Sequence, residues 1–228
     1  MTGQLEVTVL HAHDVAGAQE GGADRLYLVV RGTDGSTSPT PAALSAVLRE
    51  TDLPVRVVLK LTAGHMTTGG EFARLVGLAG EYAALGAEGL AFGFLDSDLE
   101  VDVRTCQALG EALPDLPWTF TRALDDSLDP RRSWRRLTGL PGLDTVRSAG
   151  SPRGLSVGYD DLLALAESSA EVARLLMPSG GLLAEQVPWF ARAGVRKFHV
   201  GSQVRPGGSY KAYVDAALVR SWRLLLDR

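Results

Sequence analysis

The sequence predicts an α/β fold, a single-domain (β/α)8 TIM barrel spanning residues 1–228. Short apolar runs recur at intervals of roughly 20 to 35 residues, the length of one strand–loop–helix–loop unit, and a segment with helical periodicity follows each run. Glycine ends several of these helical segments just before the next run. The alternative, an open doubly wound sheet, requires edge strands more polar than these runs.

The eight predicted strands are taken from the apolar runs in chain order. Most runs are nearly continuous in apolar residues, which is typical of strands buried on both faces. The sixth run, Thr145–Arg147, gives the weakest indication of a strand. The predicted strands are Leu5–Leu10, Arg25–Val30, Val55–Leu61, Gly89–Leu95, Trp118–Thr121, Thr145–Arg147, Val172–Met177 and Lys197–Val200.

Capping residues locate the helices between the strands. Two prolines follow a residue that can accept a hydrogen bond at a helix N-terminus, which is the usual arrangement of an N-cap and the first helical position. We expect helices over Val103–Leu113 and Lys211–Leu226, and a first helix that ends at Gly21-Gly22. The predicted N-caps are Asp14, Thr40, Asp102 and Asp129, and the predicted glycine ends include Gly86 and Gly194.

Composition excludes several classes of function. The 228 residues carry 23 Lys and Arg against 27 Asp and Glu, a net charge of −4, which argues against a nucleic-acid partner. The single Cys106 forms no intramolecular disulfide, and the N-terminus is unlike a signal peptide, so we expect a cytoplasmic protein. No apolar run approaches the roughly 18 residues of a membrane span, so we expect no membrane partner.

Polar residues follow every predicted strand, at the end where barrels of this class carry their sites. Together they form a ring of cations, hydroxyl groups and a few carboxylates that contains all four histidines of the chain. These residues are His11 and His13, Arg31, Lys60, Thr62 and His65, Asp96 and Asp98, Thr121, Arg122 and Asp125, Arg147 and Ser148, Ser179, Gly180 and Gly181, and His199, Gly201 and Ser202.

An anionic ligand is the first interpretation of this ring. The segments Ser179-Gly180-Gly181 and Gly201-Ser202 follow the last two strands, where many barrels bind phosphate through backbone N–H groups. Three cations, Lys60, Arg122 and Arg147, add charge. The alternative is that these glycines only form tight turns.

Metal binding and covalent catalysis are two further interpretations. On an extended segment His11 and His13 point the same way, and with His65 and His199 they form a candidate all-imidazole metal site. The alternative is four separately hydrogen-bonded histidines. Copper(I) prefers sulfur ligands, so we expect no tight stoichiometric copper site and predict no cofactor from these residues. Lys60 with Asp96 as a base is a candidate for Schiff-base chemistry, although a role in binding is favoured.

Several strings resemble the CutC family of copper homeostasis proteins. Leu5-Glu6-Val7 and Gly22-Ala23-Asp24-Arg25-Leu26 are similar to the start of that family. Gly93-Phe94-Leu95-Asp96, with Asp98 and Asp102 after it, resembles a Gly-x-Leu-Asp-x-Asp-Gly-x-Ile-Asp segment. Thr119–Asp125 resembles a Thr-Phe-His-Arg-Ala-Phe-Asp signature, and Phe198-His199 with Ser202 resembles the last strand. The matches occur in order over nearly the whole predicted barrel.

The resemblance implies a cytoplasmic, homo-oligomeric (β/α)8 barrel associated with copper tolerance, so copper enters as a cofactor through the resemblance alone. This chain departs from the family pattern in the pocket, where Thr121 replaces the signature histidine, Val7, Thr8 and Val9 stand in the region of the family's cysteines, and Arg147 begins the segment after the sixth strand. Matching family positions are Glu6, Asp24, Arg25, Asp96, Arg122, Asp125 and His199.

Three functional hypotheses follow. The first is a barrel that binds a small anionic or phosphorylated ligand at its mouth, with or without turnover. The second is a copper-binding protein that uses the histidines, and the third is a non-catalytic oligomeric scaffold. We expect Asp96, Arg122, Asp125 and His199, the candidate catalytic residues, to converge on one cavity. The expected ligand contacts are Glu6, Lys60, Arg122, Arg147, Ser179, Gly180, Gly181, Gly201 and Ser202, and we expect a homodimer with tryptophans on outer helices.

Overall fold

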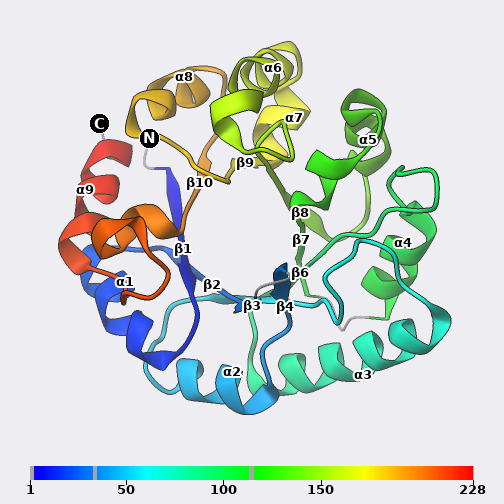
Figure 1. Ribbon diagram of the computed structural model, residues 1–228, viewed down its shortest axis with the longest axis horizontal. Helices are drawn as coiled ribbons and strands as arrows, with labels where there is room; N and C mark the ends of the chain where they lie inside the picture. Colours follow the sequence, from blue (N-terminus) through cyan, green and yellow to red (C-terminus); the bar gives the residue numbers. More distant parts are fainter. Residues whose placement is uncertain (1–2, 33–34, 113–115, 228) are drawn as a thin grey trace.

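The computed structural model describes residues 3–32, 35–112 and 116–227, and these form a barrel. Figure 1 shows strands in an inner ring and helices in an outer ring around them. The eight strands of the main sheet pair in parallel in the order β10-β1-β2-β5-β6-β7-β8-β9. The predicted (β/α)8 TIM barrel is therefore confirmed.

The first and last predicted strands lie side by side, as a barrel requires. Glu6 on β1 is in register with His199 on β10 and with Arg25 on β2. No ladder joins β9 to β10 in the described part of the chain, so the ring of strands is nearly closed. The strands are β1 Gln4–Val9, β2 Arg25–Leu28, β5 Val55–Val58, β6 Gly89–Phe92, β7 Trp118–Phe120, β8 Leu143–Ser148, β9 Leu176–Pro178 and β10 Lys197–Val200.

The inside of the barrel is polar, which corrects the prediction of continuously apolar strands. On β1, Leu5, Val7 and Val9 belong to the main hydrophobic core, whereas Glu6 and Thr8 alternate with them and are also buried. Successive side chains of a strand point to opposite faces, so the apolar set faces the helices and the polar set faces the lumen. Buried Arg25, Arg56, Thr119, Thr145 and His199 occupy corresponding positions on other strands.

The outer helices begin and end largely where the capping residues predict. The side chains of Thr40, Asp102 and Asp129 each accept a hydrogen bond from a backbone N–H of the first helical turn, and glycine follows α1 and α3. The helices are α1 Val15–Gly21, α2 Pro41–Leu48, α3 Gly69–Leu85, α4 Val103–Glu111, α5 Pro130–Leu137, α6 Leu155–Ser168, α7 Ala170–Leu175, α8 Val187–Arg192 and α9 Ala216–Leu226. None of the described helices is long and apolar enough to cross a membrane.

Several predicted boundaries are wrong. The predicted strands that begin at Arg25, Val55 and Gly89 extend two or three residues beyond the observed ones, and three further boundaries differ as follows. Val172–Met177 is mostly helix α7, capped by Ser169, because its apolar residues form one buried helix face, a pattern that a short run does not distinguish from a strand. The last helix begins at Ala216 rather than Lys211, since Asp215 caps it. Helix α4 ends at Glu111, and position 113 lies outside the described residues.

Asp14 is the predicted N-cap that does not cap. It precedes α1, but its side chain makes no capping hydrogen bond. The carboxylate is instead fully buried, accepts hydrogen bonds from the backbone N–H groups of Leu10 and Val214, and pairs with Arg205. Asp14 therefore ties the end of β1 to the segment that precedes α9.

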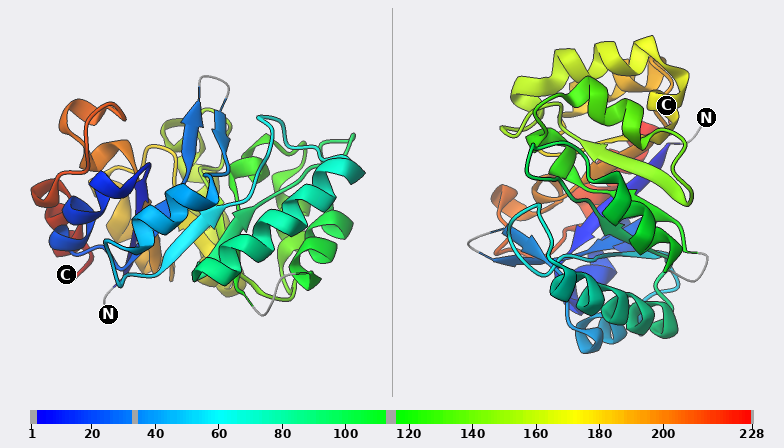
Figure 2. Two further views of the ribbon diagram at one scale, coloured as in Figure 1. Left: turned by 90° about the horizontal axis from the view of Figure 1, so that it is seen from below. Right: turned by 90° about the vertical axis from the view of Figure 1, so that its right-hand side faces the viewer.

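An antiparallel hairpin after β2 was not predicted. Strands β3 (Val30–Gly32) and β4 (Gly35–Thr37) pair with Arg31 opposite Ser36. Figure 2 shows the hairpin projecting from one end of the barrel, away from the two chain termini. It forms one wall of the mouth described below.

Candidate functional site

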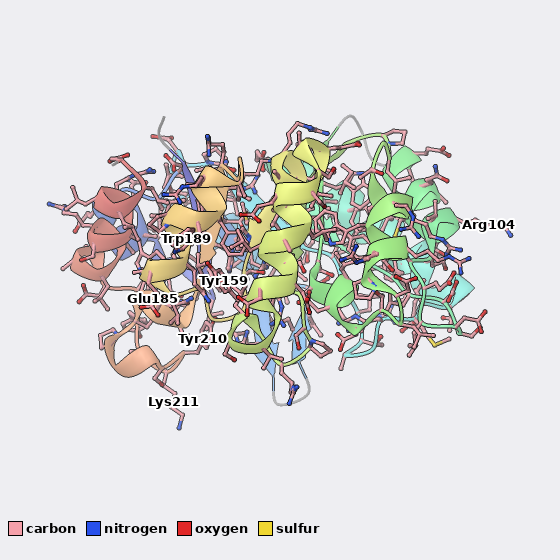
Figure 3. All side chains as sticks on the ribbon, turned by 90° about the horizontal axis from the view of Figure 1, so that it is seen from above. Arg104, Tyr159, Glu185, Trp189, Tyr210 and Lys211 are labelled. Carbon is pink, nitrogen blue, oxygen red and sulfur yellow. The ribbon has the colours of Figure 1, made fainter. Side chains whose placement is uncertain are left out.

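A cavity of about 360 Å³ lies at the C-terminal ends of the strands. Strand ends, the β3–β4 hairpin and the loop after β10 form its walls, and Figure 3 shows Tyr210 and Lys211 at the end from which the hairpin projects. The lining residues are Thr8, Tyr27, Val29, Arg31, Gly35, Ser36, Val58, Lys60, Ala63, His65, Thr121, Arg122, Ala123, Asp126, Arg147, Pro152, Gly180, Gly181, His199, Gly201, Ser202, Gln203 and Tyr210.

Cations dominate the charge of this cavity. Arg31, Lys60 and Arg147 line it, and none of them forms an ion pair within 4.0 Å with a carboxylate of the described residues. The Arg147 guanidinium lies 4.0 Å from the centre of the Tyr27 ring, and its Nε is buried without a hydrogen-bond partner in the described part of the chain. Burial lowers the pKa of Lys60, although the charge of Asp126 opposes this shift.

A buried chain of four side chains forms the floor. Thr8 Oγ1 lies 2.8 Å from His199 Nε2, and His199 Nδ1 lies 2.7 Å from Glu6 Oε1. Arg25 donates from Nε to the other Glu6 oxygen at 2.7 Å. Adjacent strands β10, β1 and β2 hold these groups in register, so the barrel itself sets their geometry.

The ionisation of this chain follows from its contacts. The pKa of Glu6 is lowered: burial opposes the charged form, but Arg25 and the hydrogen bond from His199 outweigh burial. Burial and the nearby charge of Arg147 lower the pKa of His199 to about 4, so the imidazole is neutral at pH 7. An ionised Glu6 requires the proton of that ring on Nδ1, which leaves Nε2 to accept a hydrogen bond from the Thr8 hydroxyl.

Arg122 is paired with a carboxylate instead of being free for a ligand. Its Nε donates to Asp125 Oδ2 at 2.7 Å, and Nη2 donates to the carbonyl of Ser151 at 3.2 Å. The same Asp125 accepts hydrogen bonds from Ser148 Oγ and the backbone N–H of Ala149. Burial raises the pKa of Asp125, and Arg122 opposes this rise. Arg122 therefore serves to compensate a buried carboxylate at the cavity wall.

Glycine at position 180 lets Arg122 lie in this place. Gly180 has φ +84°, and a Cβ there would come 2.8 Å from Arg122 Cζ. A side chain at 180 would therefore be strained and would displace the guanidinium. A Cβ at Gly201 would similarly lie 2.2 Å from the Tyr210 hydroxyl, so glycine allows Tyr210 to approach the floor.

The structure brings together part of the predicted site. Arg122 and His199 line the same cavity, with Lys60, Arg147, Gly180, Gly181, Gly201 and Ser202. Glu6 lies beneath it and reaches it through His199. Asp96, Asp125 and Ser179 do not line it.

Each of these three side chains has another place. Asp96 accepts hydrogen bonds from the backbone N–H groups of Asp98 and Glu100, and so organises the turn after β6. Asp125 faces Arg122 and Ser148. The Ser179 side chain is fully buried, with no hydrogen-bond partner for its hydroxyl in the described part of the chain.

The four histidines lie in three separate places. Residues 12–14 form a 3-10 helix, which invalidates the extended geometry expected for His11 and His13, and both rings pack near Tyr213. His65 Nε2 is 2.9 Å from Asp126 Oδ2, and His199 is in the floor. Among the described residues no three His, Cys, Asp or Glu side chains are placed to hold a metal ion.

Sequence reasoning missed several residues of the cavity. Thr8, Tyr27, Asp126, Gln203 and Tyr210 all line it. The signal for Thr8 and Tyr27 was available, because they alternate with apolar residues on β1 and β2 as Glu6 and Arg25 do. No comparable pattern marks Tyr210, which lies on a loop that was predicted to adjoin a helix.

The chain is similar to the proteins of one known family. The model of the CutC family matches residues 3–204. This chain belongs to the CutC family. A Klebsiella pneumoniae protein named as family protein CutC is 29% identical over 222 residues, which cover 93% of this chain and 89% of that protein. The human protein named copper homeostasis protein cutC homolog is 28% identical over 201 residues, with coverages of 87% and 73%.

Solved structures agree on the fold. The crystal structure of the CutC protein from Streptococcus agalactiae superposes with a TM-score of 0.76 at 22% identity, covering 88% of this chain and 98% of that one. A phosphoribosylanthranilate isomerase from Thermotoga maritima gives a TM-score of 0.63 at 13% identity and covers 100% and 99% of the two chains. At these identities the likeness concerns the barrel alone.

The copper implied by the family name does not fit the donors of this CutC chain. Cys106 is buried on α4, and burial raises the pKa of its thiol to about 12. Met177 is buried in β9, and the exposed Met66 lies outside the cavity lining. Copper(I) prefers thiolate and thioether ligands, and among the described residues no group of three or more His, Cys, Asp or Glu side chains is placed to hold a metal ion.

Proposed function

We propose that this CutC-family barrel binds a small anionic ligand, such as a phosphorylated metabolite, in the cavity at its mouth. The observation that carries the proposal is the pair Arg147 and Lys60, two cations in one cavity without a carboxylate partner in the described part of the chain. Withdrawing charge from water without compensation is unfavourable, and a bound anion supplies the compensation. Arg147 presents the planar donor group that suits phosphate and carboxylate.

The other charges of the cavity support an anion over a cation. Asp126 is the one carboxylate among the described lining residues, and its Oδ2 lies 2.9 Å from His65 Nε2, whereas Arg31, Lys60 and Arg147 bring three cations to the same cavity. His199 is neutral at pH 7, so it opposes neither sign of ligand. The cavity therefore carries an excess of positive charge, which attracts anions from solution.

Size and backbone also suit this class of ligand. A cavity of about 360 Å³ falls in the range that holds small metabolites. Gly180 and Gly181 line it with backbone that no side chain shields, and in the described part of the chain their N–H groups donate to no backbone carbonyl. Such N–H groups add hydrogen bonds to an anion held by arginine and lysine.

The proposal is tested by titration with inorganic phosphate at constant ionic strength. We expect saturable binding to the wild type, and Arg147→Gln and Lys60→Met each to weaken it at least tenfold, because a hydrogen bond to a charged group contributes about 1.5–3 kcal/mol. Lys211→Met is the matched control: Lys211 lies at the same end but outside the cavity lining, so its loss should leave the affinity unchanged. Isothermal titration calorimetry measures all four proteins.

Equal weakening by Lys211→Met would show that net charge alone attracts phosphate. Unchanged affinity in both Arg147→Gln and Lys60→Met would contradict the proposal.

Arg122→Ala tests the stability of the fold and not ligand binding, since Arg122 compensates the buried charge of Asp125. It should reduce the free energy of unfolding by about 1–3 kcal/mol through the partner left buried.

The other functional proposals rest on less. The relatives' names associate the family with copper homeostasis, but the donor set described above gives no support for copper binding through the histidines. We retain the homodimer as a proposal: Trp134 is buried in the core, while Trp189 on α8 is half exposed and is available for a contact. A cytoplasmic location remains a prediction from the sequence.

A further inference from the structure

We propose that the anion bound in this cavity also carries a hydroxyl group, and that this group donates a hydrogen bond to Thr8 Oγ1 on the floor. The inference rests on the proposed anion binding and adds the ligand's second recognition element. In this proposal the hydrogen-bonded chain Thr8–His199–Glu6 recognises that hydroxyl group. The ligand class is a hydroxylated phosphate ester.

Glu6 is held at the buried end of this chain by two close contacts. Its two oxygens lie 2.7 Å from His199 Nδ1 and 2.7 Å from Arg25 Nε, and its side chain is fully buried. Arginine can only donate, so Glu6 accepts from Arg25, and this cation together with the hydrogen bond from His199 lowers the pKa of Glu6 and keeps the carboxyl group ionised. A carboxylate can only accept, so the second contact requires a proton on His199 Nδ1.

Thr8 is the member of the chain that, like His199, lines the cavity. With the imidazole proton on Nδ1, Nε2 holds a lone pair, and the 2.8 Å contact to Thr8 is a hydrogen bond donated by the threonine hydroxyl. The hydroxyl has a single proton, and this contact uses it. Towards the cavity, Thr8 therefore offers only acceptor lone pairs. A ligand group next to it is favoured if it donates, and a second acceptor there is repelled.

The Thr8 acceptor lies in the same cavity as the cations proposed to bind the anion. Thr8 and Tyr27 are register partners on β1 and β2, and the Tyr27 ring contacts Arg147 on one side and His199 on another. Both Thr8 and Arg147 line the same cavity. The Arg147 guanidinium and the Thr8 hydroxyl, which can only accept from a ligand, thus both lie close to the Tyr27 ring. A ligand with an anionic end and a hydroxyl on a neighbouring carbon matches both.

The test compares two phosphate esters of equal charge and carbon number, sn-glycerol 3-phosphate and n-propyl phosphate. We expect the wild type to bind the glycerol ester at least fivefold more tightly by calorimetry, because the net contribution of one neutral hydrogen bond changes an affinity by about this factor. Thr8→Val keeps the branched side chain but removes the acceptor, so the preference should fall to near one. Thr8→Ser keeps the hydroxyl and should keep the preference.

The outcomes separate the two proposals. If both esters bind the wild type equally well, the hydroxyl inference is wrong while anion binding stands. If neither ester nor inorganic phosphate binds, both are wrong. A preference that survives in Thr8→Val would place the hydroxyl contact elsewhere and overturn the role of Thr8. Should Thr8→Val fail to fold, the wild-type comparison of the two esters still decides the ligand class.

Discussion

Asp14→Asn should reduce the free energy of unfolding by about 3–5 kcal/mol, the cost of removing one partner of a buried ion pair. Asp14 and Arg205 are both fully buried, and two contacts of 3.0 and 2.8 Å join them. Asparagine has nearly the same shape but directs an amide NH2 group at donors. The charge of Arg205 then remains buried without its counter-ion. Urea unfolding at pH 7 measures the effect.

The matched control is Asp160→Asn on the exposed side of α6, which should change the free energy of unfolding by no more than about 0.5 kcal/mol. The Asp14 pair also supports the site, because the Arg205 guanidinium lies 5.3 Å from the centre of the Tyr210 ring at the mouth. We therefore expect weaker phosphate binding in Asp14→Asn as well. A variant as stable as the wild type would show that this pair contributes little to the barrel.

Wild-type stability should fall as the pH drops from about 6.5 towards 4, and His199→Gln should remove a large part of this fall. The ordinary pKa of histidine is 6.5, and burial with the nearby charge of Arg147 lowers the pKa of His199 in the folded protein to about 4. Between these values the unfolded chain binds the proton and the folded chain does not, so acid favours unfolding. The stability that is lost when His199 must be protonated is therefore fully present above pH 6.5.

The expected difference between the two proteins is on the order of 2–3 kcal/mol when unfolding free energies at pH 7 and pH 4.5 are compared. His65 also has a lowered pKa, chiefly from burial, and contributes to the same window in both proteins. His13→Gln, at an exposed position, is the control and should follow the wild-type profile. Parallel pH profiles for wild type and His199→Gln would show that His199 titrates normally.

Local chemistry was sufficient to predict most of the fold. Thr40 and Asp129 before proline locate two helix starts to the residue, because a capping oxygen and a preset backbone angle leave few alternatives. Spacing locates seven of the eight strands, and the seventh predicted run overlaps β9 only at Leu176 and Met177. The run at Val172 misled because its apolar side chains form a helix face, and the start of α9 was misplaced because Asp215 caps it four residues beyond Lys211.

The site was predicted less completely, for two physical reasons. On β1, Glu6 and Thr8 alternate with apolar residues, which indicates that they face the lumen. Because the strands were predicted to be apolar on both faces, the polar lumen was not predicted. Whether a polar side chain that follows a strand faces the cavity also depends on the hydrogen-bond and ion-pair partners near it in space, which the sequence does not reveal. Asp96 folds back on its own turn, and Asp14 finds Arg205 far along the chain.

The proposed function requires an anion site at Arg147 and Lys60, and a crystal structure of the wild type grown with phosphate tests this site most directly. We predict tetrahedral density within hydrogen-bonding distance of both side chains, inside the cavity lined by Tyr27 and His199. Phosphate bound only elsewhere on the molecule, with water alone between Arg147 and Lys60, would contradict the proposed function.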